Sequence, residues 1–78
     1  MKDANASILL AFGQRLRAVR TATRISQETL AELAELDRTY ISLLERGKRN
    51  PSLGCVASLA KALNVTVSEL FDFDRDAV

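Results

Sequence analysis

The 78-residue sequence contains no histidine and no tryptophan, and it has only one cysteine, one proline and three glycines. Without histidine, the usual base that activates a nucleophile is missing, and one cysteine makes neither a zinc site nor an internal disulfide. Three scattered glycines form no phosphate-binding loop. Carboxylate pairs such as Glu32 and Glu35 have no catalytic partner in the sequence. We therefore expect no enzyme activity, no metal and no cofactor.

Long apolar runs are also missing. No stretch approaches the roughly 20 apolar residues of a membrane span, and the apolar run after Lys2 and Asp3 is too short for a signal peptide. We expect a cytoplasmic protein with no membrane partner. The length allows one domain, over residues 1–78, which must bury its apolar side chains efficiently or borrow the surface of a partner.

The residues that are abundant favour helices. Hydrophobic residues make up 47% of the chain, mostly Leu, Ala, Val and Ile, and this mixture suits a helical bundle better than a sheet. The net charge is only +1, but residues 1–50 hold nine Lys/Arg against six Asp/Glu, or +3, and residues 51–78 hold two against four, or −2. A basic N-terminal part and an acidic C-terminal part can orient a protein on an anionic partner.

Apolar periodicity predicts an all-α fold, a compact bundle of five helices. The helices are expected at about residues 7–23, 27–34, 38–46, 53–63 and 67–71. The first has an apolar stripe formed by Leu9, Phe12, Leu16 and Val19. The second should pack through Leu30, Ala31, Leu33 and Ala34. The fourth should pack through Leu53, Val56, Ala57, Ala60 and Leu63.

Capping residues mark the predicted helix ends. The last four helices each follow a residue that can accept a bond from the first turn: Ser26, Asp37, Ser52 and Thr66. Glu69 would complete a capping box with Thr66. Gly47 and Asn64 should end the third and fourth helices, because both residue types tolerate the left-handed conformation. The tail over residues 72–78 alternates aspartate with apolar residues, and we expect it to fray.

The second and third helices, joined by about three residues and followed by a glycine and a basic loop, form a helix-turn-helix pattern. On a helical wheel, Ile41 and Leu44 of the third helix point into the core. The opposite face carries Thr39, Ser42, Leu43 and Arg46, with Arg38 at its border. Such groups can read base edges in the major groove. The same wheel also describes an ordinary amphipathic helix with a solvated polar face.

Three segments together resemble the phage-repressor-like (Xre/Cro) helix-turn-helix family: SQETLA at 26–31, LDRTYIS at 36–42 and LERGKRNP at 44–51. The similarity covers about residues 12–71, and the small size is similar to that of restriction–modification controller proteins. The resemblance implies a transcription regulator whose third helix enters the major groove of double-stranded DNA. RNA polymerase is a further candidate partner. An antitoxin-like or adaptor module that binds a protein is the competing hypothesis.

The resemblance also implies roles for individual residues. Gln27 would contact a phosphate through its side chain or its backbone N–H. The residues expected to bind DNA from the recognition helix are Arg38, Thr39, Tyr40, Ser42, Leu43 and Arg46. The loop residues expected to contact the DNA backbone are Lys48, Arg49 and Asn50. The alternatives are that Gln27 is an ordinary first-turn residue and that the loop is merely solvated.

Arg20 and Glu45 fall on the buried sides of their helices, where unpaired charges are rare. The resemblance implies an ion pair between them; the alternative is that both reach solvent. Glu35 stands where the family often has glycine, so it would cost about 1 kcal/mol if the backbone there is left-handed. Cys55 is expected to be a small core residue, with a redox switch as the alternative.

One recognition helix covers only a few base pairs, so we expect a homodimer on a (pseudo)palindromic operator. The C-terminal end offers more apolar surface than the bundle obviously needs. The predicted dimer contact consists of Leu59, Leu70, Phe71 and Phe73. The alternative is that Leu70 and Phe71 close the core of the monomer, which would leave Phe73 unexplained.

Overall fold

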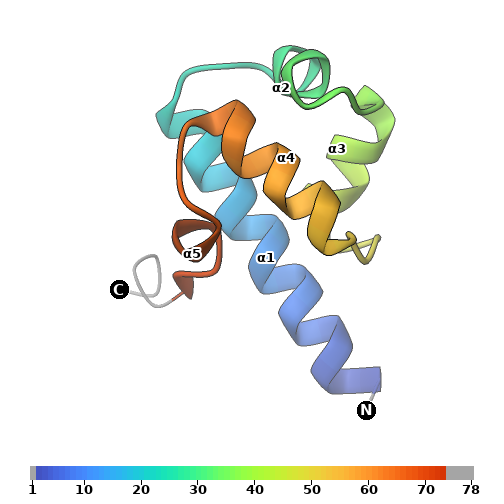
Figure 1. Cartoon of the computed structure of the whole chain (residues 1–78). Helices are drawn as coiled ribbons and strands as arrows, with labels where there is room; N and C mark the ends of the chain where they lie inside the picture. Colours follow the sequence, from blue (N-terminus) through green and yellow to red (C-terminus); the bar gives the residue numbers. More distant parts are fainter. Residues whose placement is uncertain (1, 74–78) are drawn as a thin grey trace.

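The computed structural model describes residues 2–73, and these residues form five α-helices and no strand (Figure 1). The helices are α1 (Lys2–Ala22), α2 (Gln27–Ala34), α3 (Arg38–Glu45), α4 (Leu53–Leu63) and α5 (Val67–Leu70). The predicted all-α, five-helix fold is confirmed, although α1 begins five residues earlier than residue 7. No helix within this range is long and apolar enough to cross a membrane. Residues 74–78 of the tail predicted to fray lie outside the described residues.

The helix N-termini are capped as predicted. The Ser26, Asp37 and Ser52 side chains each accept a bond from a first-turn N–H at 3.0 Å. Thr66 and Glu69 exchange both bonds of the capping box, also at 3.0 Å. These bonds satisfy N–H groups that have no partner inside the helix, and they fix where each helix starts.

Three positions at helix ends adopt the positive φ angles that their places in the sequence suggest. Gly47 (φ 71°) follows α3, Asn64 (φ 57°) ends α4, and Glu35 (φ 58°) ends α2. Glu35 therefore keeps the conformation that favours glycine, at a cost of about 1 kcal/mol. Its backbone N–H compensates in part, because it donates to the carbonyls at the end of α2. Arg24 also has a positive φ, of 63°, which the sequence did not indicate.

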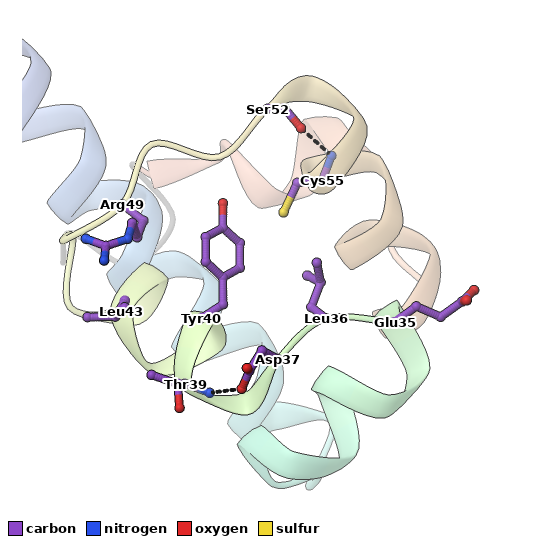
Figure 2. A pocket seen from close by; sticks show the side chains of 9 residues that line it. All are labelled: Glu35, Leu36, Asp37, Thr39, Tyr40, Leu43, Arg49, Ser52 and Cys55. Atoms are coloured by element: carbon purple, nitrogen blue, oxygen red, sulfur yellow. Dashed lines mark hydrogen bonds between the residues drawn. The ribbon is translucent and has the colours of Figure 1, made fainter.

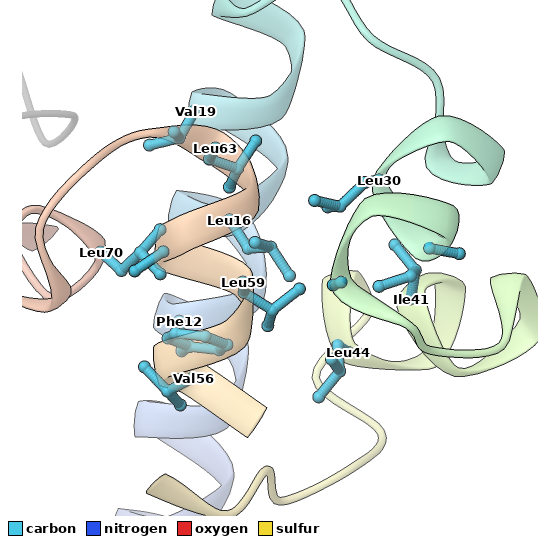
Figure 3. Close-up of a cluster of buried hydrophobic side chains, with 13 residues drawn as sticks. Phe12, Leu16, Val19, Leu30, Ile41, Leu44, Val56, Leu59, Leu63 and Leu70 are labelled. Atoms are coloured by element: carbon cyan, nitrogen blue, oxygen red, sulfur yellow. The ribbon is translucent and has the colours of Figure 1, made fainter. Parts of the chain in front are cut away.

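The core lies between α1, α4 and the pair α2 and α3 (Figure 3). The α1 stripe is buried as expected, apart from Leu9, which is half-buried. Three predicted core residues are instead on the surface: Leu33 (58% exposed), Leu53 (82%) and Ala57. Leu53 is the first residue of α4, and Leu33 is on the outer side of α2. A helical wheel cannot tell which residues beside an apolar stripe the neighbouring helices will reach.

Two residues of the predicted dimer contact are in the core. Leu59 and Leu70 have no exposed surface, so the prediction that they contact a partner is wrong. Leu59 lies at the centre of α4, among side chains of the other helices, and Leu70 closes the core from α5 (Figure 3). Phe71 remains 38% exposed and its ring centroid lies 5.4 Å from that of Phe12. Phe73, a tail residue, packs against the core and against Phe71 rather than fraying.

Gly13 allows α1 to pass very close to the end of α3. A β-carbon at this buried position would lie 2.4 Å from the Leu44 carbonyl oxygen and 2.7 Å from that of Glu45. Backbone oxygens cannot move aside as a flexible side chain would, so the position requires glycine. Local sequence does not mark Gly13 as special, because the requirement comes from another helix.

The predicted ion pair between α1 and α3 is present. The Arg20 Nε and Nη2 atoms donate to the two carboxylate oxygens of Glu45, at 2.6 and 3.0 Å. Both side chains are largely buried, at 12% and 3% exposed, so the alternative that they extend into solvent is wrong. Arg20 Nη1 also donates to the Ile25 carbonyl at 2.9 Å, and the bidentate geometry is the strong form of such a pair.

A second arginine is buried that the sequence did not lead us to expect. Arg15 of α1 is 6% exposed, and its Nε donates to the Glu69 carbonyl of α5 at 2.8 Å. On a wheel of about 100° per residue it lies about 40° from Val19, at the edge of the apolar stripe, and this was a signal that it is close to the core. Arg15 therefore links α1 to α5, as Arg20 links α1 to α3.

Breaking the Arg20–Glu45 pair from either side should lower the free energy of unfolding by about 2–4 kcal/mol, because the remaining charge stays largely buried. A double-mutant cycle with Arg20→Met and Glu45→Gln, measured by urea unfolding, should give a coupling energy above about 1 kcal/mol. Arg17→Ala, at an exposed arginine of the same helix, should change stability by less than about 0.5 kcal/mol. A coupling energy of zero would contradict the pair.

Two glycine-to-alanine substitutions should have opposite signs. Gly13→Ala should destabilise the protein by about 1–3 kcal/mol, because the new methyl group collides with backbone oxygens of α3. Gly54→Ala, in α4, has only the Ser52 hydroxyl oxygen nearby, at 3.8 Å. It should stabilise the protein by up to about 1 kcal/mol through helix propensity. Thermal unfolding of both variants compares them directly, and equal shifts would show that Gly13 is not a contact point.

Candidate nucleic-acid interface

The turn between α2 and α3 is held firmly on both sides. The Leu36 N–H donates to the Ala31 carbonyl at 2.8 Å, and the Asp37 carboxylate accepts from the Thr39 N–H. Leu36 is half-buried and packs against the core. Both helices are thereby fixed relative to each other, as a helix-turn-helix requires.

The third helix presents two different faces. Ile41, Leu44 and the paired Glu45 are buried, so the inward face is the one predicted. On the other side, Arg38, Thr39 and Arg46 are exposed, while Ser42 and Leu43 are half-exposed. The Arg46 Nε donates to the Ser42 carbonyl at 3.4 Å. The outer face therefore offers hydroxyls, guanidinium groups and one leucine, and the bundle holds it in a fixed orientation.

The loop after α3 adds cations beside this outer face. It turns at Gly47, where the Lys48 N–H donates to the Leu43 carbonyl at 2.8 Å. Lys48, Arg49 and Asn50 are all exposed. Arg49 lines the same hollow as residues from the outer side of α3 (Figure 2). The structure thus brings Thr39, Tyr40 and Leu43 of α3 together with Arg49 of the loop, whereas Asn50 lines a different groove.

The hollow beside α3 has a volume of about 630 Å³ and opens widely to solvent (Figure 2). Its walls are formed by the turn between α2 and α3, the outer side of α3 and the first turn of α4. The residues that line it are Glu35, Leu36, Asp37, Thr39, Tyr40, Leu43, Arg49, Ser52 and Cys55. Because it is so open, it suits a surface laid across it better than an enclosed small molecule.

Tyr40 differs from the other predicted DNA-binding residues of α3. It is half-buried against the core, and it lines the hollow together with Cys55 of α4. Burial, together with this neighbour, raises the pKa of Tyr40, and the Arg49 guanidinium opposes the rise. Tyr40 therefore contributes to the packing of α3 against the core, while it also forms part of the wall of the hollow.

Cys55 has the properties of a packing residue. It is half-buried against the core, as predicted. Burial raises the pKa of its thiol, and the Tyr40 hydroxyl only partly offsets this effect. A raised pKa lowers the fraction of reactive thiolate near neutral pH, which argues against the redox-switch alternative.

The resemblance implied a phosphate contact for Gln27, but its side chain has a partner inside the protein. It is the first residue of α2, and its side-chain amide donates to the Glu45 carboxylate at 3.0 Å. The side chain is therefore already used inside the protein, although backbone N–H groups in the first turn of a helix have no partner within it.

No group of three or more His, Cys, Asp or Glu residues within the described part of the chain could hold a metal ion.

Comparisons with known proteins give the family. A model described as a helix-turn-helix domain matches residues 11–72. The control protein C.BamHI of Bacillus amyloliquefaciens is 47% identical over 68 residues, which cover 86% of this chain and 84% of that protein. The control protein C.MunI of Mycoplasma sp is 45% identical over 71 residues, covering 88% and 96%.

A solved structure agrees with these relatives. The restriction-modification controller protein C.AhdI from Aeromonas hydrophila has a TM-score of 0.80 and 56% identity, over 81% of this chain and 96% of that one. These relatives are regulators and not enzymes, in agreement with the expectation from the sequence. With most of its length matched in both sequence and fold, the chain belongs to the helix-turn-helix family of DNA-binding transcription regulators.

Proposed function

We propose that the protein is a sequence-specific regulator of the restriction–modification control type, which binds a (pseudo)palindromic operator as a homodimer. The observation that carries this proposal is that Arg49 of the exposed basic loop lines one hollow with Thr39 and Leu43 on the outer side of α3. The similarity to C.BamHI, C.MunI and C.AhdI supports the control-protein type.

In this proposal, α3 reads bases in the major groove. The Arg38 guanidinium can donate two bonds to guanine, and the Thr39 and Ser42 hydroxyls can donate to or accept from several base edges. Leu43 can contact a thymine methyl group. Because Tyr40 packs against the core, it would mainly keep these side chains in register and add an apolar contact at the wall of the hollow.

Phosphate contacts would come from both ends of the helix-turn-helix. Lys48 and Arg49 supply positive charge, Arg46 lies just before them at the end of α3, and Asn50 adds an amide. At the start of α2, the Gln27 backbone N–H is better placed than its side chain to meet a phosphate, because that side chain is bonded to Glu45. These contacts would position the protein without reading sequence.

We infer the homodimer from the short length of one recognition helix. An eight-residue α3 spans too few base pairs for a specific site, whereas two copies can read half-sites about one helical turn apart. The acidic Glu69 of α5, which lies on the other side of α4 from α3 (Figure 1), would then face away from the phosphates. RNA polymerase would be a further partner wherever the operator adjoins a promoter, and the position of the operator would decide between activation and repression.

Duplex binding should depend steeply on salt. If Lys48 and Arg49 of both copies each neutralise one phosphate, the slope of log affinity against log salt should be about −4, or roughly 10²-fold between 50 and 200 mM salt. A site selected from random duplexes and titrated by fluorescence anisotropy gives this slope. Salt-insensitive affinity would instead favour the antitoxin-like or adaptor hypothesis, in which this face binds a protein.

Substitutions should distinguish the residues that contact bases from those that contact phosphates. Arg38→Ala, Thr39→Ala and Ser42→Ala should relax the preference at particular base pairs, by about 1–3 kcal/mol for each good hydrogen-bonding pair with a base that the substitution removes. Lys48→Ala should instead weaken binding to all duplexes similarly and reduce the salt slope of the dimer by about 2. Binding to a panel of single-base-pair variants of the selected site tests both. This division of roles fails if Lys48→Ala changes the preferred sequence.

A further inference from the structure

Two exposed arginines near the C-terminal end of α1 are not among the proposed DNA contacts. Arg17 is on the helix, and Arg24 lies two residues beyond its end, in the turn that leads to α2. Both residues are exposed, and within residues 2–73 neither side chain forms a hydrogen bond or an ion pair with another residue. We call Arg17 and Arg24 the flanking arginines.

Contacts between α1 and the end of α3 fix where Arg17 lies. A β-carbon at Gly13 would lie 2.4 Å from a carbonyl oxygen of α3, and Arg20 bonds to Glu45. Arg17 lies between these two positions in the sequence and, at about 100° per residue, about 40° from Gly13 on the helical wheel. It is displaced from Gly13 in the direction opposite to the buried Leu16. Its side chain therefore leaves α1 beside the end of α3 and away from the core.

The turn that carries Arg24 is held against the same end of α3. Arg20, the partner of Glu45, also donates to the Ile25 carbonyl at 2.9 Å. The Gln27 amide donates to Glu45 at 3.0 Å. Three residues of extended chain span at most about 11 Å, so Arg24 lies close to the first turn of α2. A phosphate bound by the Gln27 backbone N–H would therefore be near the guanidinium of Arg24.

The backbone of Arg24 has a conformation that favours glycine. Its φ angle is 63°, and the Ile25 N–H donates to the Arg20 carbonyl across it, as at helix ends that usually carry glycine. A side chain at such a position lowers stability. The Arg24 guanidinium forms no bond within the described residues that would offset this loss. It is therefore available for a ligand outside the chain.

The charges around the flanking arginines favour an anion. Arg46 follows the last residue of α3, Lys48 follows in the loop, and both are exposed. The carboxylate at this end of α3, that of Glu45, is already neutralised by Arg20. The exposed carboxylate closest in sequence to the flanking arginines is that of Glu28, and the exposed cations outnumber it. An anionic ligand would reduce the repulsion between these cations.

We infer that the flanking arginines bind phosphates of the DNA backbone next to the phosphate that the start of α2 contacts. The inference rests on the proposed DNA binding and adds contacts from outside the helix-turn-helix. Seven residues of helix rise about 10 Å, whereas successive nucleotides of one strand rise about 3.4 Å, so Arg17 and Arg24 would bind different phosphates. Guanidinium groups suit this role because they can donate two parallel bonds to one phosphate.

The affinity for the operator should depend on the flanking arginines and not on a cation elsewhere. With them, the salt slope of the wild-type dimer should be about −7 rather than the −4 or so expected from the loop cations alone. Arg17→Ala and Arg24→Ala should each weaken binding about threefold to tenfold at about 100 mM salt, and each should make the slope less negative by about 2. Lys61→Ala is the matched control, because Lys61 is exposed on α4 and lines a different groove. It should change neither quantity.

Two further substitutions distinguish phosphate binding from a structural role. Arg17→Lys keeps the charge and should retain most of the affinity that Arg17→Ala loses. Arg24→Gly removes the guanidinium but suits the left-handed backbone, so it should raise the urea midpoint of unfolding while it weakens DNA binding. If the arginine acted only through the fold, stability and affinity would instead change in the same direction.

Lys48→Ala keeps this inference separate from the proposed function. If Lys48→Ala makes the salt slope less negative while Arg17→Ala and Arg24→Ala behave like Lys61→Ala, the inference is wrong and the loop contacts stand. If Arg17→Ala and Arg24→Ala weaken binding but Lys48→Ala does not, the flanking contacts are supported and the proposed role of the loop is wrong. Wild-type affinity that does not depend on salt would contradict both.

Discussion

The buried carboxylate of Glu45 is the point at which three helices meet. It accepts two bonds from Arg20 of α1 and one from Gln27 of α2, while its own backbone ends α3. A largely buried carboxylate is costly without such partners, so the three helices have to assemble together for any of these groups to be satisfied. The direction in which α3 faces solvent therefore depends on one ionised group on its inner side.

The long helix α1 acts as the support for this arrangement. Gly13 lets its backbone touch the end of α3, Arg15 bonds to α5, and Arg20 reaches Glu45. One helix thus positions both the recognition helix and the short α5 that closes the core. Two of these contacts involve α3, so small shifts of α3 against α1 are opposed by backbone contact at Gly13 and by the ion pair of Arg20.

The two sides of α3 have different physical constraints. Its inner side is set by packing, where Ile41 and Leu44 have almost no exposed surface and little room for change. Its outer side is exposed and can vary at little cost in stability, which is the property a sequence-reading surface needs. Tyr40 lies between the two, because it packs half-buried against the core while it also borders the outer hollow.

The sequence by itself determined the features that depend on neighbouring residues. Apolar periodicity and the caps at Ser26, Asp37, Ser52 and Thr66 located the helices, because capping and amphipathicity act within a few residues. The segments 26–31, 36–42 and 44–51 indicated the family, and with it the Arg20–Glu45 pair.

Only the tertiary structure decided the features that depend on how the helices pack. It buried Leu59 and Leu70, exposed Leu33 and Leu53, required glycine at position 13, and turned the Gln27 side chain inward to Glu45. A wheel gives the direction of a side chain about its own helix axis but not how close the next helix lies. The same apolar residue is therefore core or surface according to contacts between segments far apart in the chain.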